Sequence, residues 1–272
     1  MKGNLKLLLL LPMCWMTIAV QAQDLHKHNE DLTCVNKNFN TLVHVAVDSA
    51  GRLPIVDENF IIRLLGQTSN LFEPICMSFT NCEINIMEDN YNYSSIENSP
   101  ISVENQLIKM DNMFSKNKRI NIFISNYISD FYCGYGVQDG LKTSDEANVY
   151  IAIKGCPEEA YLNLAHQLGH LLGLYDTNYL DYGLELADGS NCSTTGDQIC
   201  DTPADPYRKI ELKDIYVNED CEFIFETKDP NDNYYEPQVG NIMGLYECKC
   251  GFTREQYLKM VETYQNSPFK QY

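Results

Sequence analysis

The chain has 272 residues, of which 38 are acidic and 20 are basic, and its formal net charge at pH 7 is −18. So acidic a chain is unsuited to binding nucleic acid, because the phosphate backbone is itself anionic. The length suits one large domain, or two subdomains that share a cleft.

The first 22 residues are typical of a signal peptide. Lys2 and Lys6 begin an apolar stretch that ends in a suitable cleavage site after Ala22. A membrane anchor is the alternative, but the stretch is shorter than the ~18 residues of a span and contains Pro12. We therefore expect a secreted or extracytoplasmic protein without a stable membrane anchor.

Cleavage after Ala22 would remove Cys14 and leave an even number of cysteines. In an exported chain such a set predicts disulfide bonds. A structural zinc cluster is the alternative, but the Cys248-x-Cys250 and Cys192-x7-Cys200 spacings differ from those of zinc ribbons and fingers. The remaining cysteines are Cys34, Cys76, Cys82, Cys133, Cys156, Cys192, Cys200, Cys221, Cys248 and Cys250.

After a polar lead at residues 23–38, the first half of the chain predicts alternating strands and helices. Apolar periodicity and β-branched runs predict strands at 41–47, 75–86, 120–124 and 149–153, and helices at 57–71 and 103–114. This pattern predicts an α/β fold in which helices pack against a mixed sheet.

A further helix, predicted at 157–172, has recognisable ends. Pro157 suits a first helical turn, Glu158 and Glu159 favour its positive end, and Gly173 suits its stop. Beyond it the sequence is irregular through Asn241, before a last helical pattern at 253–264. The change of character near Gly173 divides the expected domain, 39–272, into an upper part (39–173) and a lower part (174–272).

Two histidines on the predicted helix at 157–172 suggest a metal site. His166 and His170 are four residues apart and share one helix face, so one ion can bind both. A histidine pair alone is a weak signal. Gly173, however, lets the chain reverse and return Asp176 towards the same ion. Residues 166–176, HQLGHLLGLYD, then form a complete frame.

This frame resembles the metzincin zinc motif HExxHxxGxxH, with Gln167 in place of the glutamate and Asp176 in place of the third histidine. Three later segments narrow the resemblance to the pappalysins. They are Gly196–Ala204 (GDQICDTPA), the Met-turn-like Asn241-Ile242-Met243, and a closing segment with Cys250, Phe252-Thr253, Gln256 and Met260. The resemblance covers roughly residues 39–264.

The pappalysin resemblance implies an α/β (α+β) fold. A mixed sheet with a backing helix and a zinc helix would lie above an irregular, disulfide-stapled lower part with the Met-turn and a C-terminal helix. The implied zinc ligands are His166, His170 and Asp176, with Met243 and Gly173 in structural roles. The implied partner is a peptide or protein in the cleft.

Departures at catalytic positions change the functional expectation. Gln167 has nearly the shape of a carboxylic acid but no useful basicity, so it cannot act as the general base. Asp176 remains an acceptable zinc ligand. Leu245 replaces the tyrosine usual in the pappalysin Met-turn, and the side chain of the following Tyr246 is expected to point elsewhere. We therefore expect an impaired pseudoprotease, with an active zinc endopeptidase and a metal-free structural domain as alternatives.

Acidic residues, cysteines and histidines outside this frame give three further expectations. Asp197, Asp201, Thr202 and Asp205 form an acidic cluster for Ca²⁺, as in some pappalysins, or else a solvated loop. The lower part is expected to be stapled by Cys192, Cys200, Cys221 and Cys250, in a pairing that the sequence does not reveal. His44 lies in a predicted strand and is interpreted as a core or sheet-face histidine, whereas His26 and His28 belong to the polar lead.

Overall fold

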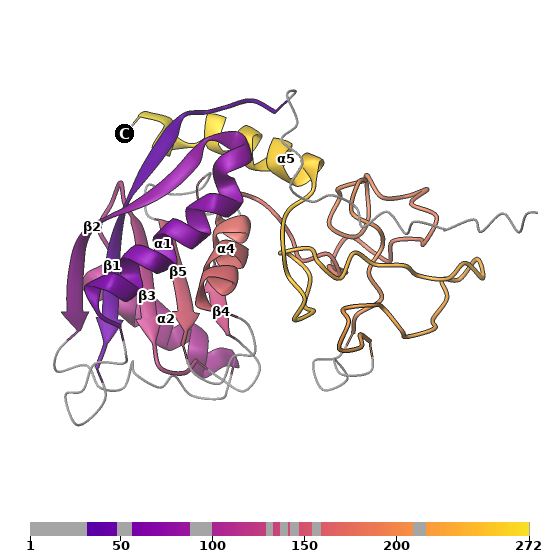
Figure 1. Ribbon diagram of the computed structural model, residues 1–272, viewed down its shortest axis with the longest axis horizontal. Coiled ribbons are helices and arrows are strands. Elements are labelled where there is room, and N and C mark those ends of the chain that lie inside the picture. Colours follow the sequence, from indigo (N-terminus) through magenta and orange to yellow (C-terminus); the bar gives the residue numbers. More distant parts are fainter. Residues whose placement is uncertain are drawn as a thin grey trace, which may run out of the picture.

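The computed structural model describes residues 32–47, 56–87, 100–128, 133–136, 141, 147–153, 159–208 and 216–271. The predicted signal peptide, 1–22, lies outside these residues, as do Pro157 and Glu158. Figure 1 shows a half built of sheet and helices beside a half built of irregular loops. Among the described residues, no helix combines the length and the apolar character needed to cross a bilayer.

A five-stranded sheet in the order β2-β1-β3-β5-β4 forms the upper half. Four strands run parallel, and the short β4 pairs antiparallel with β5. Every residue of β3 and β5 is buried, as expected for parallel strands covered on both faces. The strands are β1 (Lys37–Ala46), β2 (Met77–Met87), β3 (Ile120–Ser125), β4 (Gly134–Gly136) and β5 (Ala147–Ala152). The predicted mixed sheet is confirmed.

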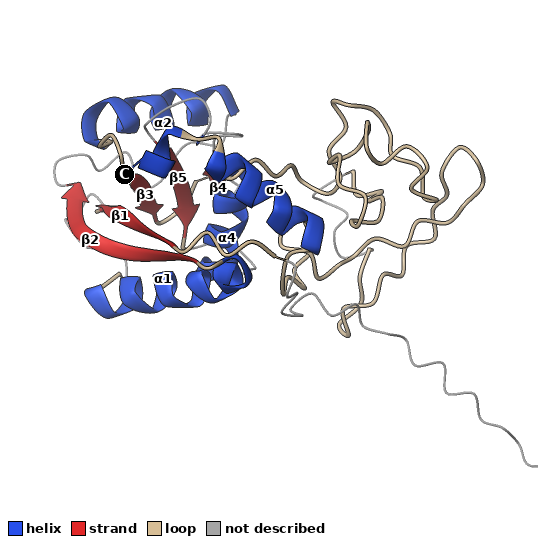
Figure 2. Ribbon diagram, turned by 90° about the horizontal axis from the view of Figure 1, so that it is seen from above, coloured by secondary structure: helices blue, strands red, loops and turns tan. Residues whose placement is uncertain are grey.

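Helices cover both faces of this sheet (Figure 2). The helices α1 (Glu58–Phe72) and α4 (Ala160–Leu171) lie on one face, and α2 (Pro100–Phe114) lies on the other. The short helix η1 (Glu73–Ile75) leads from α1 into β2. Asp57 caps α1 by accepting a 2.7 Å hydrogen bond from the amide of Phe60.

The boundaries of two predicted segments differ from expectation. α4 begins at Ala160 after an extended Glu159, later than the predicted start at 157. Its end agrees with the prediction, because Gly173 has φ = +92°, a conformation that glycine adopts without strain. β1 begins at Lys37, so the last residues of the expected polar lead already belong to the sheet.

Outside this sheet, the lower part contains little regular structure. Within 174–208 and 216–253 the structure has turns and isolated bridges rather than strands or helices. A separate aromatic cluster centred on Tyr207, Tyr216 and Tyr246 supplies its core. The chain then forms α5 (Arg254–Gln265) and η4 (Pro268–Gln271). Thr253 and Gln256 close the start of α5 with a reciprocal capping box.

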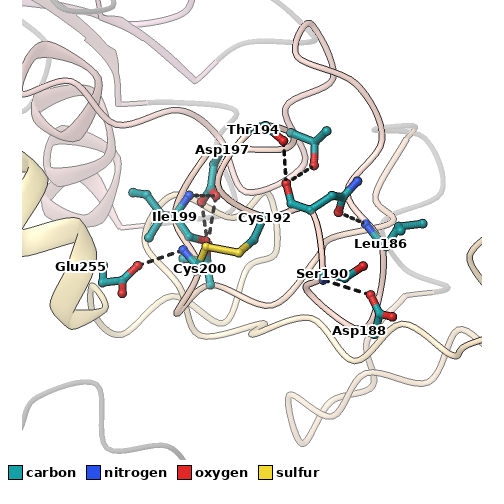
Figure 3. The surroundings of a disulfide bond; sticks show 12 residues. Leu186, Asp188, Ser190, Cys192, Thr194, Asp197, Ile199, Cys200 and Glu255 are labelled. Carbon is teal, nitrogen blue, oxygen red and sulfur yellow. Dashed lines mark hydrogen bonds between the residues drawn. A yellow bond between two sulfur atoms is a disulfide. The ribbon is translucent and has the colours of Figure 1, made fainter.

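Disulfide bonds hold both halves, which confirms the prediction of disulfides. The described bonds are Cys34–Cys76, Cys192–Cys200 and Cys221–Cys248. Figure 3 shows Cys192–Cys200 beside α5, where Glu255 accepts a 2.9 Å hydrogen bond from the amide of Cys200. The prediction that Cys250 staples the lower part is wrong. Cys221 bonds Cys248 instead, and Cys250 is an exposed thiol, as is Cys82.

Candidate metal site

Side chains from α4 and the turn after it bring three potential ligand atoms together. The Nε2 atoms of His166 and His170 are 3.1 Å apart. Asp176 Oδ1 lies 3.1 Å from His166 Nε2 and 3.5 Å from His170 Nε2. Within the described ranges, these residues are the one group of three or more His, Cys, Asp or Glu side chains whose ligand atoms all lie within 4.8 Å of one another. The predicted convergence of the three side chains is confirmed.

Local backbone structure explains how Asp176 reaches the histidines. The α4 helix places His166 and His170 on one face, and the left-handed Gly173 reverses the chain. A 2.9 Å hydrogen bond from the amide of Leu174 to the carbonyl of Gly169 closes this turn. The amide of Thr177 then donates to the carbonyl of Met243 at 3.1 Å, which ties the returning segment to the Met-turn.

The rear nitrogens of both imidazole rings face backbone carbonyls. His166 Nδ1 lies 2.8 Å from the oxygen of Ile242, and His170 Nδ1 lies 2.9 Å from that of Leu174. Contacts of this kind orient the ring of a metal-binding histidine. They leave Nε2 of each ring facing the common point.

The spacing of the three ligand atoms fits a zinc ion. Zinc bonds of about 2.0–2.1 Å at tetrahedral angles place neighbouring ligands about 3.3 Å apart. The three observed separations, 3.1, 3.1 and 3.5 Å, bracket that value. Asp176 Oδ1 is also a buried atom that lacks a hydrogen bond of good geometry, and Zn²⁺ would satisfy it.

Electrostatics within the site favour a charged carboxylate. Burial opposes the charge of Asp176, but the two neighbouring histidines together hold its pKa well below the usual range. Burial and the charge of Lys249 lower the pKa of His166. For His170, burial acts against protonation, yet Asp176 and the Leu174 carbonyl raise its pKa overall.

Gln167, at the position expected for the general base, is buried and engaged with its own helix. Its Nε2 donates to Asn163 Oδ1 at 3.4 Å, and Asn163 Nδ2 donates to the carbonyl of Cys133 at 2.6 Å. The strand β4 lies directly against this pair. A Cβ atom on Gly134 would come within 2.5 Å of Asn163 Oδ1 and 2.7 Å of Gln167 Nε2.

The turn at 241–243, where the Met-turn was predicted, packs against α4. A Cβ atom on Gly169 would lie 2.5 Å from Met243 Sδ, so this glycine lets the methionine pack under α4. Asn241 fixes the turn by accepting a 2.9 Å hydrogen bond from the amide of Met243. The amides of Asn241 and Gln256 also exchange two hydrogen bonds of 3.1 Å.

Neither Leu245 nor Tyr246 supplies a hydroxyl group to the site. Leu245 packs against the aromatic cluster of the lower part. Tyr246 is buried in that cluster and donates a 2.7 Å hydrogen bond to Asp205 Oδ1. Its side chain thus points elsewhere, as expected.

The predicted acidic cluster is not a solvated loop. Asp197, Thr202 and Asp205 are buried, and Thr202 Oγ1 lies 3.0 and 2.9 Å from the two carboxylate oxygens of Asp197. Asp201 is half-buried, accepts a hydrogen bond from the amide of Glu255 through Oδ2, and has a second oxygen, Oδ1, without a hydrogen-bond partner. The buried Glu185 joins the cluster and has one oxygen without a hydrogen-bond partner.

Burial is the main reason why these carboxyl groups resist ionisation. It raises the pKa of Glu185 to about 8, with further contributions from Asp197 and Asp205. It also raises the pKa of Asp197 to about 7 and that of Asp205 above its ordinary range.

His44 lies fully buried in β1, as expected of a core histidine. Its ring stacks on Phe123 with centroids 4.5 Å apart. Its nitrogens contact Asn121 Oδ1 at 3.3 Å and Asn85 Nδ2 at 3.1 Å.

Two residues near these sites were not identified from the sequence. Lys249 is buried with its Nζ 3.3 Å from His166 Nδ1, and Glu185 belongs to the acidic cluster. Neither forms a recognisable motif, because each meets its partners across the irregular lower part. The one sequence feature that could have drawn attention to Lys249 is its position between Cys248 and Cys250.

Together the fold and the site define a zinc-metalloprotease-like domain of the metzincin class. More specifically, the chain belongs to peptidase family M43, because the family model described as pregnancy-associated plasma protein-A matches residues 102–265. The resemblance to the pappalysins is thereby confirmed. Among curated proteins, no sequence matches this chain.

Solved structures give the same fold. Mirolysin in complex with a compound is 16% identical, with a TM-score of 0.54, over 88% of this chain and 97% of that one. A promirolysin mutant from Tannerella forsythia is 17% identical, with a TM-score of 0.54, over 92% of this chain and 87% of that one.

Proposed function

We propose that the protein is an exported, zinc-binding pappalysin-like pseudoprotease that binds a peptide or protein segment without cleaving it efficiently. The observation that carries this proposal is the pairing of three converging ligand atoms with Gln167 at the position of the general base. The spacing of the ligand atoms suits zinc, whereas Gln167 lacks the basicity that a general base needs.

When bound, zinc would supply Lewis-acid activation of a water and of a substrate carbonyl. His166, His170 and Asp176 would hold it. The remaining requirement is a base that accepts a proton from the activated water, and an amide cannot do so. Gln167 also donates a hydrogen bond to Asn163, and this bond links neighbouring turns of α4.

The edge strand β4 supports the proposal of a bound peptide. In the described sheet β4 is the outermost strand, next to β5, and a peptide can add to a sheet as a further strand at such an edge. Its glycines touch Gln167 on α4, so a peptide paired there would run beside the metal ligands. Backbone hydrogen bonding of this kind needs no catalytic base.

Two further features belong to the proposal. The N-terminal signal-like segment and the disulfide bonds favour export. Ca²⁺ is proposed at the predicted Asp197, Asp201, Thr202 and Asp205, with Glu185 beside them, since a divalent ion would compensate buried carboxylates and satisfy the oxygens of Glu185 and Asp201 that lack a hydrogen-bond partner.

Metal analysis of the purified protein, beside a peptidase assay on unstructured substrates, tests the proposal. We expect about one zinc per chain and little turnover. Chelator-sensitive cleavage comparable with that of an intact family member would favour the alternative of an active endopeptidase. Absence of zinc after loading would favour the metal-free structural domain.

A further inference from the structure

Lys249 lies directly behind one of the candidate metal ligands. Its side chain is 8% exposed, and its Nζ is 3.3 Å from His166 Nδ1. The other ring nitrogen, Nε2, faces Asp176 and His170. One imidazole ring therefore separates a buried ammonium group from the point where the ligand atoms converge.

The two neighbours of His166 Nδ1 make opposite demands on the ring. The ammonium of Lys249 can only donate a hydrogen bond, so it needs Nδ1 without hydrogen. The carbonyl of Ile242, 2.8 Å away, can only accept, so it needs hydrogen on Nδ1. A neutral imidazole carries one hydrogen and can satisfy one of these partners at a time.

Metal binding decides between these two tautomers. An ion bound at Nε2 requires the lone pair of that atom, which puts the hydrogen on Nδ1 and favours Ile242. Without the ion, hydrogen on Nε2 can point to Asp176, and Nδ1 can accept from Lys249. The positive charge of Lys249 acts in the same direction, because it repels a divalent cation across a dry interior.

We propose that Lys249 is a positioning residue that weakens the hold of the His166, His170 and Asp176 site on zinc. It does so by its charge and by stabilising the metal-free tautomer of His166. This inference rests on the proposed metal site. The site then has two arrangements. In the metal-free one, His166 Nδ1 accepts a hydrogen bond from Lys249; in the metal-bound one, Nδ1 donates to the carbonyl of Ile242 and Nε2 binds the ion.

The test compares zinc dissociation constants, measured by competition with a chromogenic chelator at fixed pH and ionic strength. Lys249→Met removes charge and donor, and Lys249→Gln removes the charge while supplying an oxygen that can accept from Nδ1. Both should bind zinc about 10–100-fold more tightly than the unaltered chain, the range typical of groups that contact metal ligands.

Two control variants separate this effect from packing and net charge. Lys249→Arg keeps the charge and the donors, so it should bind zinc within about threefold of the unaltered chain. Lys228→Met removes a lysine that pairs with Asp232 in the lower part at 2.7 Å, and it should leave the affinity unchanged. Nitrogen NMR of His166 in metal-free protein supplies a second readout. Hydrogen should reside on Nε2 in the unaltered chain and move to Nδ1 in Lys249→Met.

Unchanged or weaker zinc binding by both neutral variants would overturn the role of Lys249 while leaving the metal site standing. The same holds if metal-free His166 already carries its hydrogen on Nδ1 in the unaltered chain. Absence of zinc binding by the unaltered chain and by every variant would overturn the metal site itself, and the inference with it.

Discussion

Gln167 Nε2 donates a 3.4 Å hydrogen bond to Asn163 Oδ1, one turn earlier on α4. The other end of the Asn163 amide donates to the carbonyl of Cys133, beside the edge strand β4. The residue at the position expected for the general base is therefore part of the contact between α4 and the sheet edge. A charged group at position 167 would disturb that contact.

The first prediction concerns Gln167→Glu. Restoring the base should raise peptidase activity by less than the ~10²–10⁴-fold typical of general-base catalysis, because Leu245 and Asp176 remain altered. The new carboxylate should also face Asn163 Oδ1 and lower the stability by about 1–3 kcal/mol. Zinc-loaded protein would be assayed on unstructured substrates, and thermal unfolding would be recorded in parallel.

Adding Leu245→Tyr and Asp176→His supplies the comparison for the first prediction. We expect each addition to raise the activity of Gln167→Glu further. Brisk, chelator-sensitive cleavage by the unaltered chain would contradict the pseudoprotease assignment and leave the fold unaffected.

The second prediction concerns His44 and acid. Burial lowers its pKa to about 4, so between pH 6.5 and 4 the unfolded chain binds more protons at this residue than the folded one. The contribution of His44 is thus fully present above pH 6.5 and is lost as the pH falls to 4, by about 3 kcal/mol. Urea unfolding of the unaltered chain and of His44→Gln across this range measures it. If the free energy of unfolding falls equally in both proteins, His44 is not the source of the acid sensitivity.

The third prediction concerns the acidic cluster in calcium-free protein. Because the pKa of Glu185 is raised to about 8, the folded chain binds more protons there than the unfolded chain above pH 4.5. The contribution of protonated Glu185 to the free energy of unfolding is therefore fully present below pH 4.5 and is lost as the pH rises to 8. Ca²⁺ should reverse this loss, and Glu185→Gln should weaken the response to Ca²⁺. Thermal unfolding with Ca²⁺ or EGTA checks both; equal midpoints at pH 8 would argue against a calcium site.

The fourth prediction concerns the Met-turn. Asn241→Ala should destabilise the protein by about 2–4 kcal/mol, because it leaves the buried Gln256 amide and the Met243 amide without their partners. Denaturant unfolding measures the loss. Asn218→Ala, in an exposed turn of the lower part, serves as the matched control and should change the stability much less. If both variants lose similar amounts of stability, the Asn241–Gln256 pair does not stabilise the protein more than an ordinary turn asparagine does.

Local sequence signals determined much of the fold. The strands β1, β3 and β5 follow β-branched apolar runs, and α1 follows an apolar stripe with an aspartate cap, because side-chain periodicity is a property of neighbouring residues. The convergence of the candidate metal ligands was also predictable. His166 and His170 are one helical turn apart, and the left-handed Gly173 acts only a few residues from Asp176.

Only the tertiary structure decided the long-range contacts. Cys221 bonds Cys248 rather than Cys250, and Lys249 reaches His166 across 83 positions of sequence. Glu185 likewise meets Asp197 and Asp205 inside the lower part. That part lacks a repeating apolar pattern to fix its path, so its contacts depend on how disulfides and the aromatic cluster fold the chain back. A residue such as Lys249 therefore has no local signature, although it touches the candidate metal ligand His166.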